Sequence, residues 1–304
     1  MIILSRATGG SNGNEWGKIA NMPGNIEHIS DTAFWVAHYR AMESARPDAH
    51  FRDPYAGVLA GSHGEEIVKR LRFAQSSAWA MIVRTIVFDE LIFRCLRDGA
   101  TTVVNLAAGL DTRPYRLDVP PSTEWVEVDL PDILDYKEEK LRKEKPVCEL
   151  RRIKQDLSDA DGRRRLFSEI GASGRQTVIL SEGLLVYLTP ENVASLAEDL
   201  RTQQNFRWWI IDIASPALVE MMMRWYSKQF KAAGIRMQFA PAEGPDFFKS
   251  YGWNPVEFRL SMEEGIRLNR TIPNAWLWRI FSVFTSKKRR EEMSRNGMVL
   301  LAAV

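Results

Sequence analysis

The sequence is poor in the residues on which several common kinds of site depend. Among its 304 residues there are two cysteines, Cys95 and Cys148, and four histidines. Two cysteines build neither a disulfide framework nor a thiolate metal site, and their scarcity is typical of a reducing compartment. We therefore expect a cytoplasmic protein that holds no metal.

An excess of charge of one sign is also missing, as are long apolar runs. Forty-one Lys and Arg residues nearly balance 39 Asp and Glu residues, so the formal net charge is +2. A charge so close to zero argues against nucleic acid or a membrane surface as the partner. No apolar run reaches the length of about 18 residues that spans a bilayer, and residues 1–25 lack the apolar core of a signal peptide. We expect residues 1–25 to form a poorly ordered tail.

The region 26–98 shows helical periodicity. Residues 31–43 have apolar side chains at helical spacing after the capping residue Asp31, and residues 53–61 suggest a turn followed by a short helix that a glycine ends. Residues 76–96 are the clearest helix of the sequence, although Arg84 interrupts their apolar face. We predict that residues 26–98 form a helical N-terminal cover.

After residue 98, short segments rich in β-branched residues alternate with helical segments. Strands are expected at 101–107, 124–129, 149–154, 176–182 and 207–213, with helices at 131–144, 159–170 and 190–202. This alternation is typical of βαβ units and a parallel sheet. Two more strands at 253–260 and 297–304 would form an antiparallel edge pair. The sequence thus predicts an α/β fold, with a doubly wound, mostly parallel seven-stranded sheet over 99–304 and a substrate-covering insertion at about 214–250.

The loop after the first predicted strand has the sequence LAAGLDT. Ala107, Ala108 and Gly109 lack bulk at the edge of the sheet where ligands of doubly wound folds bind. Asp129 follows Gly109 by 20 residues and ends the next strand. A carboxylate at this spacing holds ribose hydroxyls in dinucleotide-type folds, because it accepts two O–H donors. The alternatives are a tight turn that needs small residues without a ligand, and an Asp129 that only caps the following helix.

The chemistry of this loop distinguishes between two cofactors. A nicotinamide cofactor would require G-x-G-x-x-G, and Asp111 would lie where a pyrophosphate needs a positive field. S-adenosyl-L-methionine has no phosphate and carries a positive sulfonium. We therefore expect S-adenosyl-L-methionine, with an NAD-dependent enzyme as the weaker alternative.

Four motifs together resemble the leucine carboxyl methyltransferase family, in particular its bacterial branch of polyketide-synthesis-type O-methyltransferases. They are NLAAGLDTRPYRL, WVEVDLPDILDYK, QDL and SEGLLVYL, and the segments around Thr32 and Arg84 also match. The resemblance implies a class I methyltransferase sheet with an N-terminal helical cover. The loop departs from the family at Ala107, where many relatives carry glycine, and alanine is tolerated there unless its φ must be positive.

The resemblance also implies roles for individual residues. Gly109 would line the methionine portion of the cofactor, and Asp129 would hold the ribose. Asp156 and Leu157 would flank the adenine.

Two charged residues complete the predicted cofactor site. Arg84 would pair with the carboxylate of the cofactor, and Glu182 would lie near its amino group. The alternatives are an arginine that extends along the helix surface and a glutamate that ends its strand in solvent.

The acceptor site is less defined. A carboxylate acceptor is ionised at pH 7 and needs no base, whereas a phenol or alcohol does. All four histidines precede the sheet, which leaves His38 of the cover as the first candidate base. Tyr187 resembles the family tyrosine near the acceptor, and it could bind an acceptor carboxylate together with Arg40 and Arg113. Arg113 could equally hold Asp111 or a helix end.

Apolar side chains of the insertion, among them Met222 and Trp225, could line the acceptor pocket. We predict an S-adenosyl-L-methionine-dependent O-methyltransferase that acts on a small molecule. The acceptor would be a carboxylate, giving a methyl ester, or a phenol of a secondary metabolite, with S-adenosyl-L-homocysteine as the product. The alternative is a non-catalytic binding or interaction protein that retains the fold. The identity of the acceptor and the oligomeric state stay open.

Overall fold

The computed structural model describes residues 31–70, 74–232, 234–271 and 295–304. The tail predicted at 1–25 lies outside these residues, as does the start of the predicted cover. None of the described helices has the length and apolarity needed to cross a bilayer.

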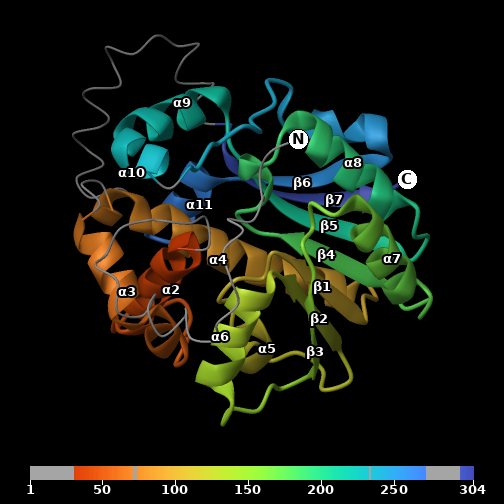
Figure 1. Cartoon of the computed structure of the whole chain (residues 1–304), viewed down its shortest axis with the longest axis horizontal. Helices are drawn as coiled ribbons and strands as arrows, with labels where there is room; N and C mark the ends of the chain where they lie inside the picture. The colour runs from red at the N-terminus through yellow and green to blue at the C-terminus, as the bar shows by residue number, and fades with distance from the viewer. Residues whose placement is uncertain (1–30, 71–73, 233, 272–294) are drawn as a thin grey trace, which may run out of the picture.

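Seven strands form one sheet in the order β3-β2-β1-β4-β5-β7-β6 (Figure 1). They are β1 (Thr102–Leu106), β2 (Glu124–Asp129), β3 (Glu149–Lys154), β4 (Thr177–Ser181), β5 (Phe206–Ile213), β6 (Trp253–Leu260) and β7 (Gly297–Ala303). The first five strands pair in parallel, and β7 is antiparallel to both β5 and β6. The predicted fold class, with a mostly parallel sheet of seven strands, is confirmed. The order reverses between β1 and β4, which is where ligands of such sheets bind.

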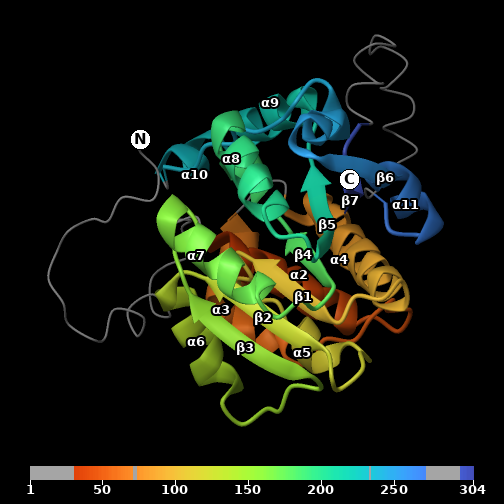
Figure 2. The same ribbon diagram turned by 90° about the vertical axis from the view of Figure 1, so that its right-hand side faces the viewer.

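Both faces of the sheet are buried, because helices cover each of them (Figure 2). On one face α7 (Ala160–Gly171) and α8 (Pro190–Arg201) pack, together with the 3-10 helix η2 (Gly244–Tyr251), against Val104, Ile179 and their neighbours. On the other face lies α4 (Ala74–Arg97), whose Val83 and Leu91 contact Val103 and the strands beside it. Every residue of β1 and β4 is buried, which follows from this coverage on both faces.

Helices α2 (Asp31–Ser44), α3 (Ala56–Arg70) and α6 (Pro131–Leu141) share a third apolar cluster that includes Phe34, Leu59 and Ile133. The glycine expected to end the helix at 53–61 is Gly61, with φ 54° and ψ −163°, but the chain returns to helix and continues to Arg70. The division of the chain at residue 98 stays a prediction, and α4 itself belongs to the core of the sheet.

The segment after β1 differs from a common βαβ unit. Its helix α5 (Arg113–Arg116) has four residues, and α4, which precedes β1 in the chain, occupies that face of the sheet instead. The region predicted as an insertion contains α9 (Pro216–Trp225), α10 (Ser227–Ala232) and η2, and α11 (Ser261–Arg267) follows β6. The loop after β1 therefore has no long helix dipole behind it, so the charges around it come from side chains.

Candidate functional site

A pocket of about 340 Å³ lies at the carboxyl ends of the central strands. The loop after β1 contributes Gly109, β2 ends in Asp129, and Glu182 follows β4 directly. Helix α4 contributes Arg84 from the opposite side. The pocket thus coincides with the reversal of strand order, and the structure brings together there the six residues predicted to contact the cofactor. They are Arg84, Gly109, Asp129, Asp156, Leu157 and Glu182.

The loop after β1 has a left-handed backbone at two positions. The φ angle is 48° at Gly109 and 54° at Ala107. A side chain at Gly109 would also meet the Cβ atom of Ala33 on α2 at 3.3 Å, so both the backbone angle and the close contact favour glycine here. At Ala107 the condition for tolerating alanine is not met, because its φ is positive and an L-residue in this region is strained.

Asp129 fixes this loop. Its Oδ2 accepts a hydrogen bond from the amide of Gly109 at 2.6 Å, and its Oδ1 accepts one from the amide of Leu130 at 2.7 Å. Burial raises the pKa of Asp129 above its usual value. Each carboxylate oxygen accepts about two hydrogen bonds, so both keep capacity for ligand hydroxyls. The alternative in which Asp129 caps the following helix is met in part, because Asp129 accepts from the amide of Leu130, the residue just before α6.

Arg84 and Arg113 tie the acidic residues of the pocket together. Arg84 Nε donates to Glu182 at 3.0 Å, and its Nη1 donates to Asp212 at 3.2 Å. Arg113 Nη1 donates to Glu182 at 2.8 Å and to Asp111 at 3.1 Å. Burial raises the pKa of Glu182, but the two guanidinium groups outweigh this and bring its pKa below its usual value. Glu182 is therefore ionised at neutral pH, which suits a contact to the amino group of a ligand.

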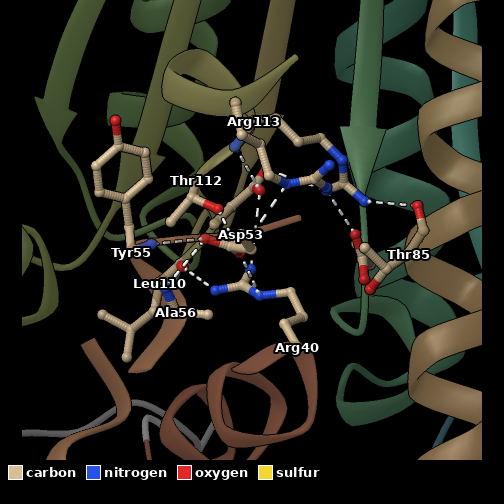
Figure 3. A network of polar contacts seen from close by, with 12 residues as sticks. Arg40, Asp53, Tyr55, Ala56, Thr85, Leu110, Thr112 and Arg113 are labelled. Carbon is tan, nitrogen blue, oxygen red and sulfur yellow. Dashed lines mark hydrogen bonds and ion pairs between the residues drawn. The ribbon is translucent and has the colours of Figure 1, made fainter. Parts of the chain in front are cut away.

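Arg113 is itself 2% exposed and lies inside the protein. Its Nε donates to Asp89 of α4 at 2.6 Å, and its Nη2 donates to the carbonyl of Thr85 at 3.3 Å (Figure 3). Of the roles considered for it from the sequence, the one in which it holds Asp111 has a direct counterpart in the structure. A contact with the acceptor stays a prediction.

Arg40 of α2 is also buried and bound within the protein. Its Nη2 donates to the carbonyl of Leu110 at 2.5 Å, and its Nε lies 3.2 Å from Asp53 (Figure 3). Thr112 donates to the same carboxylate of Asp53 at 2.6 Å. These contacts join the N-terminal helices to the loop after β1, and the role of Arg40 toward an acceptor likewise stays a prediction.

The described wall of the pocket carries an excess of negative charge. Three arginines face it, Arg40, Arg84 and Arg113, against five acids, Asp111, Asp129, Asp156, Glu182 and Asp212. The surplus of two negative charges suits a cationic ligand such as a sulfonium and opposes a pyrophosphate. This surplus is a property of the whole wall, because individual acids such as Asp111 are offset locally. Asp111 forms an ion pair with Arg113 and accepts a hydrogen bond from Asn105.

Of the other residues predicted for the acceptor site, some line the pocket and others do not. Tyr187, on the 3-10 helix η1 (Leu185–Tyr187), and Met222 of α9 line the pocket. Burial raises the pKa of Tyr187. Trp225 is not among the lining residues and packs against the third apolar cluster. His38 is not among them either; burial lowers its pKa, and Glu65 and Lys69 of α3 are the charged groups that act on it.

One acidic residue of the wall was not predicted from the sequence. Asp212, near the end of β5, accepts hydrogen bonds from Arg84 and from the amide of Gly183, the latter at 2.6 Å. The signal was present, since Asp212 stands at the carboxyl end of a predicted strand, as Asp129 and Glu182 do. The motif RWWIIDI by itself predicts only a strand.

Comparison with known proteins extends this picture. A family model described as leucine carboxyl methyltransferase matches residues 33–201. A protein of Mycobacterium avium is 38% identical over 299 residues, which cover 89% of this chain and 85% of the relative. A protein of Streptomyces coelicolor is 35% identical over 194 residues, which cover 58% of this chain and 66% of the relative. Both relatives carry the provisional name S-adenosyl-L-methionine-dependent methyltransferase.

Among solved structures, a DUF574 family protein from Streptomyces avermitilis has a TM-score of 0.57 at 12% identity, with 90% of this chain and 97% of that chain covered. At this identity the likeness shows the fold alone. S-adenosyl-L-methionine, the cofactor predicted from the loop and Asp129, is also the cofactor for which the relatives are named. The family model spans more than half of the chain, and the Mycobacterium avium relative matches over most of both sequences. The chain therefore belongs to the leucine carboxyl methyltransferase family.

Proposed function

We propose that this protein is an S-adenosyl-L-methionine-dependent O-methyltransferase that acts on a small, partly apolar molecule. The observation that carries the proposal is the pocket at the switch of strand order, whose described wall holds five carboxylates against three guanidinium groups. The cofactor brings a sulfonium, an ammonium and one carboxylate, so its net positive charge complements this wall.

Each part of the cofactor would have a counterpart in the wall. Asp129 would accept the ribose hydroxyls while it holds the amide of Gly109. Asp156 and Leu157 would flank the adenine, Glu182 would accept from the amino group, and Arg84 would pair with the carboxylate. Arg84 lies between Glu182 and Asp212, so its guanidinium is oriented before a ligand arrives.

The bound cofactor supplies a methyl group on a sulfonium, which is already an activated donor. The protein has to hold an acceptor oxygen in line with that methyl group and to exclude water. Apolar side chains line the pocket on the side of α2 and α9, among them Trp35, Leu218 and Met222. Such a wall favours an acceptor with an apolar body, and the two acceptor classes proposed are carboxylic acids and phenols.

Two measurements test this function on the full chain. Calorimetry with S-adenosyl-L-homocysteine should detect binding, and its absence would contradict the proposal. A panel of carboxylic acids, phenols, amines and thiols with isotope-labelled methyl donor should then give labelled product from an oxygen acceptor. Mild alkali releases methanol from a methyl ester and leaves an aryl methyl ether intact, which separates the two oxygen classes. Binding without any transfer would support the non-catalytic role, and labelling of amines or thiols alone would overturn O-methylation.

A further inference from the structure

One carboxylate of the pocket lies far from the predicted adenosine contacts. Asp212 is on β5, three strand positions from Asp129 on β2 in the order β2-β1-β4-β5. At the usual spacing between strands this amounts to about 14 Å across the sheet. The residues that follow Asp212, from Ile213 and Ala214 to Leu218 and Met222 of α9, line the same pocket. Asp212 therefore marks the end of the pocket away from the ribose and adenine contacts.

Asp212 has capacity for another hydrogen-bond donor. Its Oδ1 accepts from the amide of Gly183 at 2.6 Å and its Oδ2 from Arg84 at 3.2 Å. A carboxylate offers about four acceptor positions, so these two contacts leave about two. The side chain is 21% exposed and lines the pocket, so a ligand in the pocket can reach it.

The arginines of the described wall are all engaged by acidic residues of the protein. Arg40 pairs with Asp53, Arg84 with Glu182 and Asp212, and Arg113 with Asp89, Asp111 and Glu182. An anionic acceptor would add a negative charge to a wall whose surplus of two is only partly offset by the net positive charge of the cofactor. Like charges at short range disfavour the ionised form of each other, so a carboxylate acceptor would bind weakly or take up a proton.

Building on the proposed O-methyl transfer, we propose that the acceptor enters uncharged, as a hydroxyl compound, and that Asp212 accepts its hydroxyl hydrogen bond and then its proton. The acceptor oxygen forms its bond to the methyl carbon while the bond from that carbon to sulfur breaks, with the electron pair staying on sulfur. The O–H proton passes to the Asp212 carboxylate and from there to water, so atoms and charge balance. Burial raises the pKa of Asp212 despite the nearby Arg84, which strengthens this carboxylate as a base.

The first experiment compares acceptors that share an alkyl-substituted benzene ring and differ in the charge of their functional group. Matched para-alkyl phenols, benzoates and benzylamines, with short and long alkyl tails, are offered to the wild-type protein. Binding is measured by calorimetry in the presence of S-adenosyl-L-homocysteine, and turnover with labelled methyl donor. The phenols should be preferred by at least about tenfold in both measurements, equivalent to one pKa unit of charge interaction.

Preference for the benzoates would overturn this inference and leave the proposed O-methyltransferase intact. Preference for the benzylamines would overturn both. Normal binding of S-adenosyl-L-homocysteine with no binding of any phenol would also contradict the uncharged acceptor.

The second experiment tests Asp212 directly with Asp212→Asn, compared with a matched control, Asp246→Asn. Asp246 is 59% exposed and pairs with Lys249 on η2. Loss of the base should lower turnover of an alkyl phenol about 100-fold. A nitrophenol that is already ionised at neutral pH should lose far less, because it needs no base. The ratio of the two rates is taken on one protein sample, so it is independent of folding and of cofactor occupancy.

An unchanged ratio in Asp212→Asn would show that Asp212 only positions Arg84 and Gly183. Affinity for S-adenosyl-L-homocysteine, measured by calorimetry on the same samples, reports that positioning role separately. The Asp246→Asn protein should keep the wild-type ratio and affinity.

Discussion

Asp129 accepts a hydrogen bond from the amide of Gly109 at 2.6 Å, so the carboxylate assigned to the ribose also holds the loop that would surround the cofactor. The two residues are 20 positions apart: Gly109 lies in the loop after β1, and Asp129 ends the neighbouring strand β2. The spacing of 20 residues that predicts a ligand site therefore also separates two residues joined by a hydrogen bond within the protein. Loss of Asp129 removes both functions together.

Asp129→Ala should therefore weaken binding of S-adenosyl-L-homocysteine strongly. Each lost hydrogen bond to a charged group is worth about 1.5–3 kcal/mol, or about 10- to 100-fold in Kd. Calorimetry on the variant and on Asp132→Ala, an exposed acid in the first turn of α6, measures the difference. Equal affinity of the two variants would refute the assignment of Asp129.

Arg84→Ala should also abolish most cofactor binding. The change removes the predicted partner of the cofactor carboxylate, leaves Asp212 without its ion pair and leaves Glu182 paired with Arg113 alone. We expect an affinity loss of at least about 100-fold, typical of a charge-assisted contact that is lost together with its supporting ion pairs. Arg97→Ala, at the exposed end of the same helix, is the control and should bind like wild type. Wild-type affinity in Arg84→Ala would remove Arg84 from the cofactor site.

Ala107→Gly should stabilise the protein, because the backbone of Ala107 has φ 54°. An L-residue in the left-handed region costs about 1–2 kcal/mol, and the added freedom of glycine in the unfolded chain offsets about 0.5–1 kcal/mol of this. Urea unfolding should give a net gain of about 0.5–1 kcal/mol in the free energy of unfolding. Ala108→Gly, at a buried neighbour outside the left-handed region, should instead lose stability. A loss in both variants would show that Ala107 carries no strain.

Arg113→Met should lower the free energy of unfolding by about 3–5 kcal/mol, the cost of leaving buried carboxylates without their partner. The side chain of Arg113 is 2% exposed and forms ion pairs with Asp89, Asp111 and Glu182. The control is Arg224→Met, which breaks a single exposed pair with Glu220 and should cost less than about 0.5 kcal/mol. Denaturant unfolding of both variants measures the two losses. A loss in Arg113→Met as small as that in Arg224→Met would show that the Arg113 ion pairs do not stabilise the fold.

The same variant should change the dependence of stability on pH. Burial raises the pKa of Asp111 and Glu182, but the pairs with arginine outweigh it and leave both pKa values below their usual range. The unfolded chain therefore binds these protons first as pH falls, so the stability supplied by the pairs is complete above about pH 5 and declines below it. Arg113→Met should flatten this acid decline.

Burial raises the pKa of Asp129 and Asp212, so these residues give stability the opposite dependence on pH. Both residues are present in the wild type and in Arg113→Met. The difference between wild type and variant thus isolates the Arg113 pairs. Urea midpoints measured at several pH values from about 3 to 7 give the two slopes, and parallel curves would contradict the assignment.

The strands could be predicted closely from the sequence. Segments 124–129, 149–154 and 253–260 coincide with β2, β3 and β6, because short segments bounded by turn residues and alternating with helical segments have few alternative structures. The helix at 53–61 was harder, since Gly61 does interrupt it but the packing of α3 on α2 restores the helix beyond it.

The ion pairs of the site could not be predicted. Arg113 and Glu182 are 69 residues apart, and only the tertiary structure shows that they meet. For the same reason the sequence leaves three roles open for Arg113: a contact with the acceptor, with Asp111 or with a helix end. The positive φ of Ala107 could not be predicted either, because alanine rarely adopts this conformation and its presence does not indicate it.

Helix α4 also limits how a ligand can reach the pocket. It contributes Val83 and Val87 to the core of the sheet and, between them, Arg84 to the pocket. A helix with two such faces cannot swing outward without exposing the core to water, so one wall of the site is static. Among the described helices of the wall, α9 has no buried residue. We therefore expect α9 rather than α4 to move when a ligand enters, and the association rate of a ligand should report this motion.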